Sequence, residues 1–156
     1  MMEIVQRLEA NLLEATQYVE SALLADLERK PADGKWSKKE IIGHLIDSGV
    51  HNLKRFTEVQ FLPKPYVVRK YHQVELVRVN HYQEADVYEL VTCWVAINRR
   101  IAEVLRNLNE SSLNNAVILP DGTRTDFRFI VMDYIDHMEH HIRQIVNAQF
   151  VGKPGL

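Results

Sequence analysis

The chain has 156 residues, of which 46% are hydrophobic and 26% charged, a composition typical of a globular protein that buries a core of its own. The formal net charge of −2 gives no electrostatic case for nucleic acid or an anionic membrane as a partner, and the single cysteine, Cys93, excludes an internal disulfide. The N-terminus has no signal-peptide pattern and no apolar run reaches the roughly 18 residues of a membrane span, so we expect one domain, residues 1–156, in the cytoplasm.

The first predicted helix runs from about Glu3 to about Glu28. Its apolar side chains recur at spacings of three and four residues, as they do in a helix that buries one face. They are Ile4, Leu8, Leu12, Ala15, Val19, Ala22, Leu23 and Leu27. Pro31 and Gly34 follow, and because both residues disfavour helix, they mark a connection.

The second predicted helix has the clearest start signal in the chain, the stretch WSKKEI. Ser37 is the predicted N-cap, and Glu40 three residues later completes a capping box, in which each side chain bonds the backbone N–H of the other residue. Trp36 and Ile41 flank this box as a candidate hydrophobic staple. We expect this helix to run to about Phe61, where two prolines stop it.

A long connection separates the second predicted helix from the third. Residues Leu62 to about Gln83 show little periodicity, so we expect an irregular segment with room for a short helical turn. The third predicted helix follows, from about Glu84 to Asn109. Its inner face is formed by Val87, Leu90, Val91, Trp94, Ile97, Ile101, Leu105 and Leu108.

The fourth predicted helix follows a loop that contains a turn at Asp121–Gly122. Thr123 or Thr125 is its predicted start, where TRTD matches the pattern of a second capping box. Its predicted end lies near Phe150, just before a glycine and a proline of the C-terminal stretch.

Four helices of about 25 residues predict an all-α four-helix bundle. The links between the first and second helices and between the third and fourth favour antiparallel pairs. The connection between the second and third helices has about 20 residues and spans up to ~65 Å when extended, which exceeds the roughly 38 Å length of such helices. It can return the chain to the same end of the bundle, so we expect an up-down-down-up order with a long crossover.

Three histidines crowd the fourth predicted helix in the stretch DYIDHMEHHIRQI. On a helical wheel, its core face is marked by Phe127, Ile130, Tyr134, Met138, Ile145 and Ala148. His141 falls inside that arc and His137 at its edge, whereas His140 falls outside and is expected at the rim or in solvent. His137 and His141 are four residues apart, so their imidazoles can bind one ion. A hydrogen-bonded pair at the edge of the core is the alternative.

His44 is the candidate for a third ligand. It lies roughly 10 Å from the start of the second predicted helix, and His141 lies roughly 13 Å from the end of the fourth. These two helices are antiparallel in an up-down-down-up bundle, so the two histidines lie at nearly the same height. Three imidazoles would form one face of a coordination sphere and leave positions open for water or substrate, as in a catalytic zinc site.

The remaining polar residues near this candidate site have weaker cases. His51 lies two turns beyond the candidate ligand of the second helix, too far along the axis to share the ion easily. His72 and His81 lie in the long connection, and the sequence gives no reason to choose either. Asp47 and Asp133 are each about one turn from a candidate ligand, where they either orient its imidazole or remain ordinary solvated acids.

Two stretches together resemble the DinB/YfiT-like superfamily of metalloenzymes. They are WSKKEIIGHLIDSGVHNLKRF, with its Trp, capping box, His, Asp-Ser and Arg-Phe, and DHMEHHIRQI, which is similar to the closing HxxxHxxQ pattern of the family. The resemblance implies a four-helix up-down-down-up bundle with a three-histidine site for a divalent metal, often zinc or nickel. Its ligands would be His44, His137 and His141, the residues that the wheel and the heights also select. Gln144 matches the last position of the pattern, with no role assigned beyond contact with a ligand.

The resemblance also implies an activity. Characterised relatives include thiol transferases that use bacillithiol, mycothiol or glutathione, and a thiol-dependent isomerase, and homodimers are common among them. We therefore expect a divalent-metal-dependent enzyme and a homodimer. The leading hypothesis is a thiol S-transferase that joins a low-molecular-weight thiol to a small electrophile. The alternatives are a metal-dependent hydrolase, with Asp47 or His51 as its base, and a non-catalytic metal- or ligand-binding stress-response dimer.

Three residues of the remaining chain complete the expectations. Cys93 stands beside a core tryptophan and has no evident base, so we expect a buried structural cysteine rather than a nucleophile. Tyr71 and Trp94 are candidates for lining a pocket, with packing as the alternative. No catalytic residue is assigned.

Overall fold

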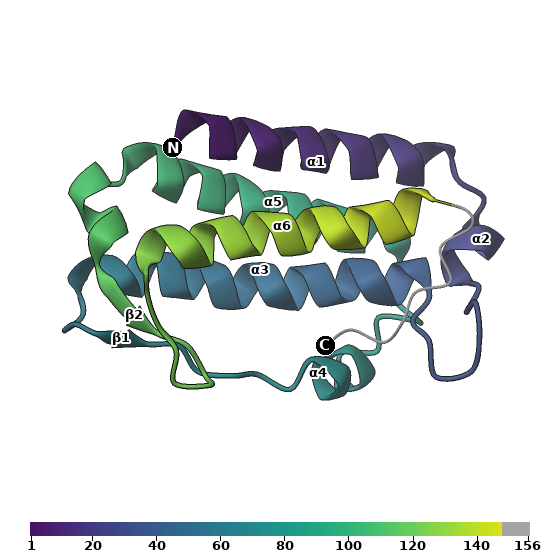
Figure 1. The fold of residues 1–156 in the computed structure, drawn as a ribbon. Helices are drawn as coiled ribbons and strands as arrows, with labels where there is room; N and C mark the ends of the chain where they lie inside the picture. The colour runs from purple at the N-terminus through teal and green to yellow at the C-terminus, as the bar shows by residue number, and fades with distance from the viewer. Residues whose placement is uncertain (148–156) are drawn as a thin grey trace.

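The computed structural model describes residues 1–147, and its four long helices form an up-down-down-up bundle (Figure 1). They are α1 (Met2–Ser21), α3 (Lys38–Phe61), α5 (Val87–Asn107) and α6 (Phe127–Val146). Helices α1 and α6 run in one direction and α3 and α5 in the other, so the crossover between α3 and α5 returns along the bundle as predicted (Figure 1). No helix in this part of the chain is long and apolar enough to cross a membrane.

The first predicted helix is interrupted in the structure. It consists of α1 and a short helix, α2 (Leu24–Glu28), with Ala22 and Leu23 in extended conformation between them. The break places α2 at the end of the bundle, where the Glu28 carboxylate accepts a hydrogen bond from Lys39 Nζ at 3.0 Å. Contacts between distant segments therefore override the local apolar period, and Leu23, expected on the core face, is 73% exposed.

The start of α3 is held by the predicted capping box. Ser37 Oγ accepts a hydrogen bond from the Glu40 N–H (3.1 Å), and Glu40 Oε2 accepts one from the Ser37 N–H (2.8 Å). The Glu40 carboxylate also accepts a hydrogen bond from Lys30 Nζ (2.8 Å), and Ser37 Oγ donates one to Gln83 Oε1 (2.5 Å). The cap ties the first turn of α3 to the preceding loop and to the crossover, and so fixes the position of His44 about two turns later.

The crossover from α3 to α5 contains more structure than the sequence predicts. It holds strand β1 (Tyr66–Val67) and helix α4 (Gln73–Val79), and α4 accounts for the short helical turn expected there. Strand β1 pairs in parallel with β2 (Ala116–Ile118), which pairs antiparallel with β3 (Arg124–Asp126). Strands of two or three residues are too short for a period to be detected in the sequence. Their pairing fixes the crossover against the loop that precedes α6.

Helix α6 begins later than predicted. Residues 124–126 pair with β2, so the predicted capping box at TRTD is wrong. Asp126 caps the helix instead, by accepting a hydrogen bond from the Phe129 N–H at 2.9 Å. The turn at Asp121–Gly122 is confirmed, with Gly122 at a φ of +88°, a conformation that glycine adopts without steric cost.

The other boundaries differ from the predicted ones by a few residues. Helix α5 begins after Asp86, whose side chain accepts a hydrogen bond from the Glu89 N–H at 2.9 Å, and the 3₁₀ helix η1 (Glu110–Asn114) follows it. Helix α6 ends at Val146, and its predicted end near Phe150 lies outside the described residues.

Gly43 lets the crossover pack directly against α3 beside His44. A Cβ atom at this position would lie 2.1 Å from two ring atoms of Tyr82, so a larger residue does not fit unless that ring moves. The Tyr82 hydroxyl in turn donates a hydrogen bond to Asp47 Oδ1, at 2.7 Å, one turn further along α3. The crossover is therefore anchored next to His44 by both packing and a buried hydrogen bond.

Replacing Gly43 by alanine is expected to destabilise the protein, although alanine is the better helix former by about 1 kcal/mol. Overpacking against the Tyr82 ring costs about 1–3 kcal/mol, so the free energy of unfolding, measured by urea titration, should fall. In a Tyr82→Gly background the ring and the Tyr82 Cβ atom, which would lie 2.7 Å from the added Cβ, are both absent, and the same substitution at Gly43 should raise the free energy of unfolding. A loss of stability that persists in that background would contradict the packing.

Candidate metal centre

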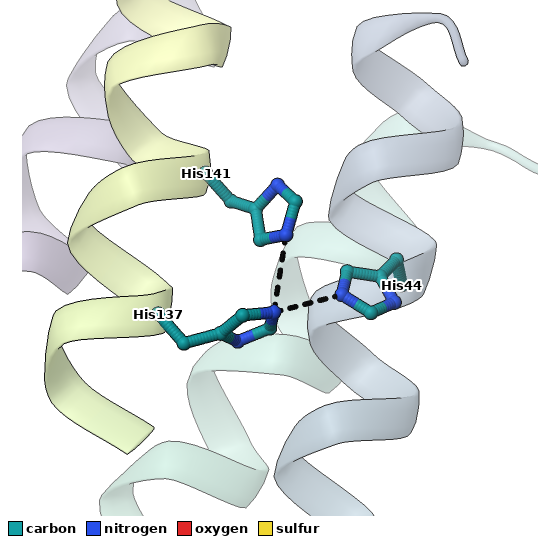
Figure 2. Close-up of side chains that lie close together, drawn as sticks. All are labelled: His44, His137 and His141. Carbon is teal, nitrogen blue, oxygen red and sulfur yellow. Dashed lines mark hydrogen bonds between the residues drawn. The ribbon is translucent and has the colours of Figure 1, made fainter. Parts of the chain in front are cut away.

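Three histidines from two antiparallel helices lie together in the bundle (Figure 2). His44 projects from α3, and His137 and His141 project from successive turns of α6 towards it. His137 Nε2 lies 3.2 Å from His44 Nε2 and 3.1 Å from His141 Nε2. One potential ligand nitrogen from each ring lies within 4.8 Å of the other two. His44 and His141 are buried and His137 is partly buried, so the cluster lies at the edge of the core.

The other four histidines lie apart from this cluster. His140 is exposed on α6, on the side that the wheel predicts, and its Nε2 lies 3.0 Å from Gln144 Nε2. His51 stacks on Tyr71 with ring centroids 4.1 Å apart. His72 and His81 are exposed residues of the crossover. The structure therefore brings together the three histidines that the sequence singled out and none of these four.

Gln144 fixes the tautomer of His141. The Gln144 side-chain oxygen lies 2.8 Å from His141 Nδ1, and the Gln144 amide nitrogen lies close to His140 Nε2. The amide oxygen can only accept, so His141 Nδ1 carries the proton and donates it. In a neutral imidazole this leaves the lone pair on Nε2, which points into the cluster. Gln144 thus contacts a candidate ligand, as its place in the motif led us to expect.

The three ring nitrogens cannot all satisfy one another by hydrogen bonds. His137 Nε2 lies close to both of the other Nε2 atoms, yet it has either one proton to donate or one lone pair to accept with. A cation between three lone pairs removes this conflict. Nitrogen ligands of a tetrahedral zinc ion, with Zn–N bonds of about 2.0–2.1 Å, lie about 3.3 Å apart. The two separations that involve His137 are 3.1 and 3.2 Å, and all three nitrogens lie within 4.8 Å of one another, so these residues fit a divalent metal.

Burial keeps the three imidazoles neutral. It lowers the pKa of His44 to about 3, with the neighbouring histidines lowering it further, and lowers the pKa of His137 and of His141 to about 4. At neutral pH each ring therefore carries one lone pair available to a metal, and no proton has to be displaced from an imidazolium. His44 Nδ1 is buried without a hydrogen-bond partner among the described residues.

The two acids near the cluster do not orient its imidazoles. Asp47 Oδ1 accepts hydrogen bonds from the Tyr82 hydroxyl (2.7 Å) and from Asn80 Nδ2 (3.0 Å), while its Oδ2 is buried without a partner among residues 1–147. Burial raises the pKa of Asp47, and the two hydrogen bonds oppose that shift. Asp133 is an exposed residue overall, but neighbouring atoms partly desolvate its carboxyl group, and this raises its pKa as well. Asp47 thus anchors the crossover, and neither acid bonds a ring of the cluster in the described structure.

A cavity of about 310 Å³ opens beside His137. Its walls come from α3, the crossover, the turn between β2 and β3, and α6. Of the two residues for which packing was weighed against lining a pocket, Tyr71 lines this cavity, whereas Trp94 packs in the core. The cavity places reactants next to the histidine cluster, and its volume suits a small molecule.

Four cavity residues of functional interest were given no role from the sequence, although two of them belong to the Asp-Ser and Arg-Phe pairs of the family motif. Ser48, Asn52 and Arg55 line the cavity from α3, and Lys70 lines it from the crossover. Together with His44, the three residues of α3 recur at spacings of four, four and three, which places them on one helical face. This polar stripe is a signal that the sequence carries. The position of Lys70 depends on the path of the crossover, which the sequence pattern does not give.

A second hollow lies on the other side of Trp36. Its volume is about 470 Å³, and Arg78, His81 and Tyr82 are among its lining residues. None of the three clustered histidines lines it. The Trp36 ring, whose centroid lies 5.1 Å from that of His44, stands between this hollow and the cluster. The smaller cavity is therefore the one that adjoins the candidate metal centre.

Cys93 is exposed, which corrects the expectation of a buried structural cysteine. The adjacent Trp94 lies on the apolar face of α5 and is buried in the core. Neighbouring positions of a helix are about 100° apart, so Cys93 points outwards. Cys93 lines neither of the two cavities described above. The cysteine thus has no part in the candidate metal centre.

Three solved structures of similar fold match this chain. YfiT from Bacillus subtilis, described as a probable metal-dependent hydrolase with an unusual four-helix bundle topology, matches with a TM-score of 0.82 and 22% identity, over 92% of this chain and 82% of its own. The mycothiol-dependent maleylpyruvate isomerase matches with a TM-score of 0.74 and 11% identity, over 94% of this chain and 61% of its own. A DinB-like protein from Bacillus subtilis, yjoa, matches with a TM-score of 0.63 and 15% identity, over 94% of each chain. At these identities the likeness concerns the fold.

The sequence itself matches one family. A comparison with curated proteins found no match. The family model of the DinB superfamily, however, matches residues 7–145, a range that contains all three clustered histidines, the crossover and most of the bundle. The match covers far more than half of the chain, so the chain belongs to the DinB superfamily.

Proposed function

We propose that this protein is a divalent-metal-dependent enzyme that joins a small thiol, through its sulfur, to the carbon of an electrophile. The metal ligands are His44, His137 and His141. The observation that carries the proposal is the convergence of three neutral imidazole nitrogens at the wall of an open cavity. Imidazole donors suit zinc and nickel among the divalent metals. Catalytic zinc sites use three protein ligands and keep another position for substrate or water.

The residues around the cluster have separate tasks in this reaction. When bound, a divalent cation lowers the pKa of a coordinated thiol or water and so supplies an anionic nucleophile at neutral pH. Gln144 holds the His141 ring in the tautomer that directs Nε2 into the cluster, and Trp36 covers His44. The cavity beside His137 holds the electrophile against the thiol sulfur. The thiol releases its proton to solvent on ionisation, a carbon–sulfur bond then forms, and the leaving group departs from that carbon with the electron pair of the broken bond.

The thiol reaction is favoured over its rivals by the surroundings of the cluster. One relative in fold is described as mycothiol-dependent and another as a probable metal-dependent hydrolase. Hydrolysis needs a base for the attacking water. Asp47, the first candidate, is bonded to Tyr82 and Asn80, and His51, the second, stacks on Tyr71. The hydrolase and a non-catalytic binding protein remain the alternatives, and the homodimer and cytoplasmic location remain predictions.

Metal content tests the ligand assignment. Purified untagged protein should contain about one divalent ion per chain by plasma mass spectrometry, as a single three-histidine site requires. His44→Ala and His141→Ala should each reduce the bound metal to background. His140→Ala is the matched control, because this histidine is on the same helix but outside the cluster, and it should keep its metal. A wild-type protein that neither contains nor takes up a divalent metal would overturn the proposal.

Thiol dependence tests the reaction. Monochlorobimane becomes fluorescent when a thiol sulfur replaces its chlorine, so metal-loaded protein should accelerate adduct formation in the presence of a small thiol. Loss of a metal ligand, as in His141→Ala, should reduce the rate above background at least about a hundredfold, because the nucleophile is then no longer ionised at neutral pH. Turnover of ester or amide substrates without any thiol, lost in the same variant, would instead establish the hydrolase.

The stability of the metal-free protein is expected to fall as the pH decreases from about 6.5 to about 4. The pKa of His44 is about 3 and those of His137 and His141 are about 4 in the folded protein, whereas unfolded histidines bind protons near pH 6.5. The unfolded state therefore takes up more protons over this range. Each histidine lowers the free energy of unfolding by up to about 1.4 kcal/mol per pH unit.

Urea unfolding of chelator-treated protein between pH 7.5 and pH 5 measures this dependence. His44→Gln is the informative variant, since glutamine does not titrate and the rest of the chain is unchanged. The free energy of unfolding of this variant should fall less steeply than that of the wild type between pH 6 and pH 5. The difference in slope should correspond to about one proton, or about 1.4 kcal/mol per pH unit. Identical slopes in the two proteins would show that His44 is not held neutral.

A further inference from the structure

The cavity beside the histidine cluster contains a guanidinium group that forms no ion pair among residues 1–147, although the Asp133 carboxylate is near enough to act on its pKa. Arg55 Nη1 donates a hydrogen bond to Asn52 Oδ1 (3.2 Å), and Nη2 donates one to the carbonyl oxygen of Arg69 (2.8 Å). Both acceptors are uncharged, and Arg55 forms no ion pair within residues 1–147. Arg7, by contrast, bonds the carboxylates of Asp136 and Glu139. A guanidinium has five N–H donors, so three remain for a ligand.

The position of Arg55 is fixed by its neighbours. Its guanidinium lies over the face of Tyr71, 5.5 Å from the ring centroid, and the ring of His51 also stacks on Tyr71. Burial raises the pKa of the Tyr71 hydroxyl, and Ser48, one turn beyond His44, opposes that shift by hydrogen bonding. Arg55 is therefore held in place in the unbound protein, which reduces the entropy lost when it binds a ligand.

The charges around the cavity favour an anion. Arg55 and Lys70 line it as cations, and Asp133 is the carboxylate among its lining residues. Burial lowers the pKa of Arg55, but a guanidinium remains charged at neutral pH. Burial, with Arg55 and Lys54 nearby, lowers the pKa of His51, so this ring is neutral at pH 7. The cavity thus has an excess of one positive charge, which suits a ligand with one negative charge.

The distance between Arg55 and the cluster limits the shape of that ligand. Arg55 is eleven residues after His44, or roughly 16 Å along α3. Helical side chains lean towards the N-terminus of their helix, which here is the direction of the cluster. The guanidinium therefore lies on the order of 10 Å from the three histidines. A ligand that reaches both has its charged group and its reacting group about 10 Å apart, the length of roughly three extended residues.

We propose that Arg55 binds a carboxylate of the thiol or of the electrophile and holds its reacting atom next to His137. The inference rests on the proposed function and specifies the substrate class, an elongated molecule with a carboxylate at the end remote from the reacting group. The planar guanidinium can pair with a carboxylate through two parallel hydrogen bonds. Arg55 is a positioning residue in this scheme, because it does not touch the reacting atoms.

Two thiols of equal length test this proposal. In 8-mercaptooctanoate the thiol and the carboxylate are at opposite ends of the chain, about 10 Å apart when it is extended. In 8-mercaptooctanol a neutral hydroxyl replaces the carboxylate. Isothermal titration of the metal-loaded protein should show that the acid binds about tenfold to a hundredfold more tightly than the alcohol. In Arg55→Gln the acid should lose this advantage, whereas the affinity for the alcohol should stay within about twofold.

Further variants distinguish pairing from general charge. Arg55→Lys keeps the charge without the paired donors, and its affinity for the acid should fall between those of the wild type and Arg55→Gln. Lys70→Gln removes an exposed charge of the same cavity and should weaken acid binding by less than Arg55→Gln does. Equal affinity of the wild-type protein for acid and alcohol would overturn the proposal, and this result does not depend on whether any variant folds.

Sulfur-free ligands separate this proposal from the proposed function. If octanoate and 8-mercaptooctanoate bind equally well through Arg55 and no thiol adduct forms, the carboxylate site is supported and the thiol reaction is not. If both thiols bind equally and react, the thiol reaction stands and the carboxylate site is wrong. Octyl phosphate, bound more tightly than octanoate and through Arg55, would identify a phosphate site and overturn the assignment to carboxylates. The same comparison can be made with the acid and the ester of one electrophile. Arg55-dependent preference for the acid form of the electrophile would assign the carboxylate to that co-substrate rather than to the thiol.

Discussion

The antiparallel packing of α3 against α6 is the constraint on which the candidate site depends. His44 is six residues after the first residue of α3 (44 − 38), and His141 is five residues before the last residue of α6 (146 − 141). At about 1.5 Å per residue, they lie roughly 9 and 8 Å from the same end of the bundle. If the two helices were parallel, the histidines would lie roughly 12 Å apart along the axis and could not share an ion. The long crossover that makes α3 parallel to α5 is also what makes α3 antiparallel to α6.

The burial of this cluster is costly for stability and useful for chemistry. Polar groups that leave water without full hydrogen bonding reduce stability, and His44 Nδ1 has no partner in the described part of the chain. Apolar residues at the three positions would avoid that cost. The same burial lowers the pKa of each imidazole far below neutrality and keeps its lone pair available. The cluster therefore fits a functional role better than a structural one.

The sequence predicts those features that depend on one helix or on the chain order of helices. The capping box at Ser37, the inward pair on α6 and the up-down-down-up order follow from local spacing and connection length. The features that it does not predict depend on contacts between distant segments. Ala22 and Leu23 are extended although neither is a helix-breaking residue type, and strands β1 and β2 pair across about 50 residues of chain. Asp126 becomes the helix cap only because the residues just before it pair with β2.

The candidate site divides into two parts with different structural origins. The histidine cluster is fixed by two long helices of the bundle, whose relative height is set by α3's cap and the crossover. The cavity is closed by the crossover and by the turn between β2 and β3, which are held together by β1–β2 pairing and by Tyr82 against Gly43. Arg55 belongs to both parts, because it extends the polar face of α3 that begins at His44 and meets Tyr71 of the crossover. A substitution at a cavity-lining residue of the crossover, such as Lys70, therefore alters what the cavity binds without changing the helix packing that positions the three histidines, so one candidate metal centre can serve different substrates within the same fold.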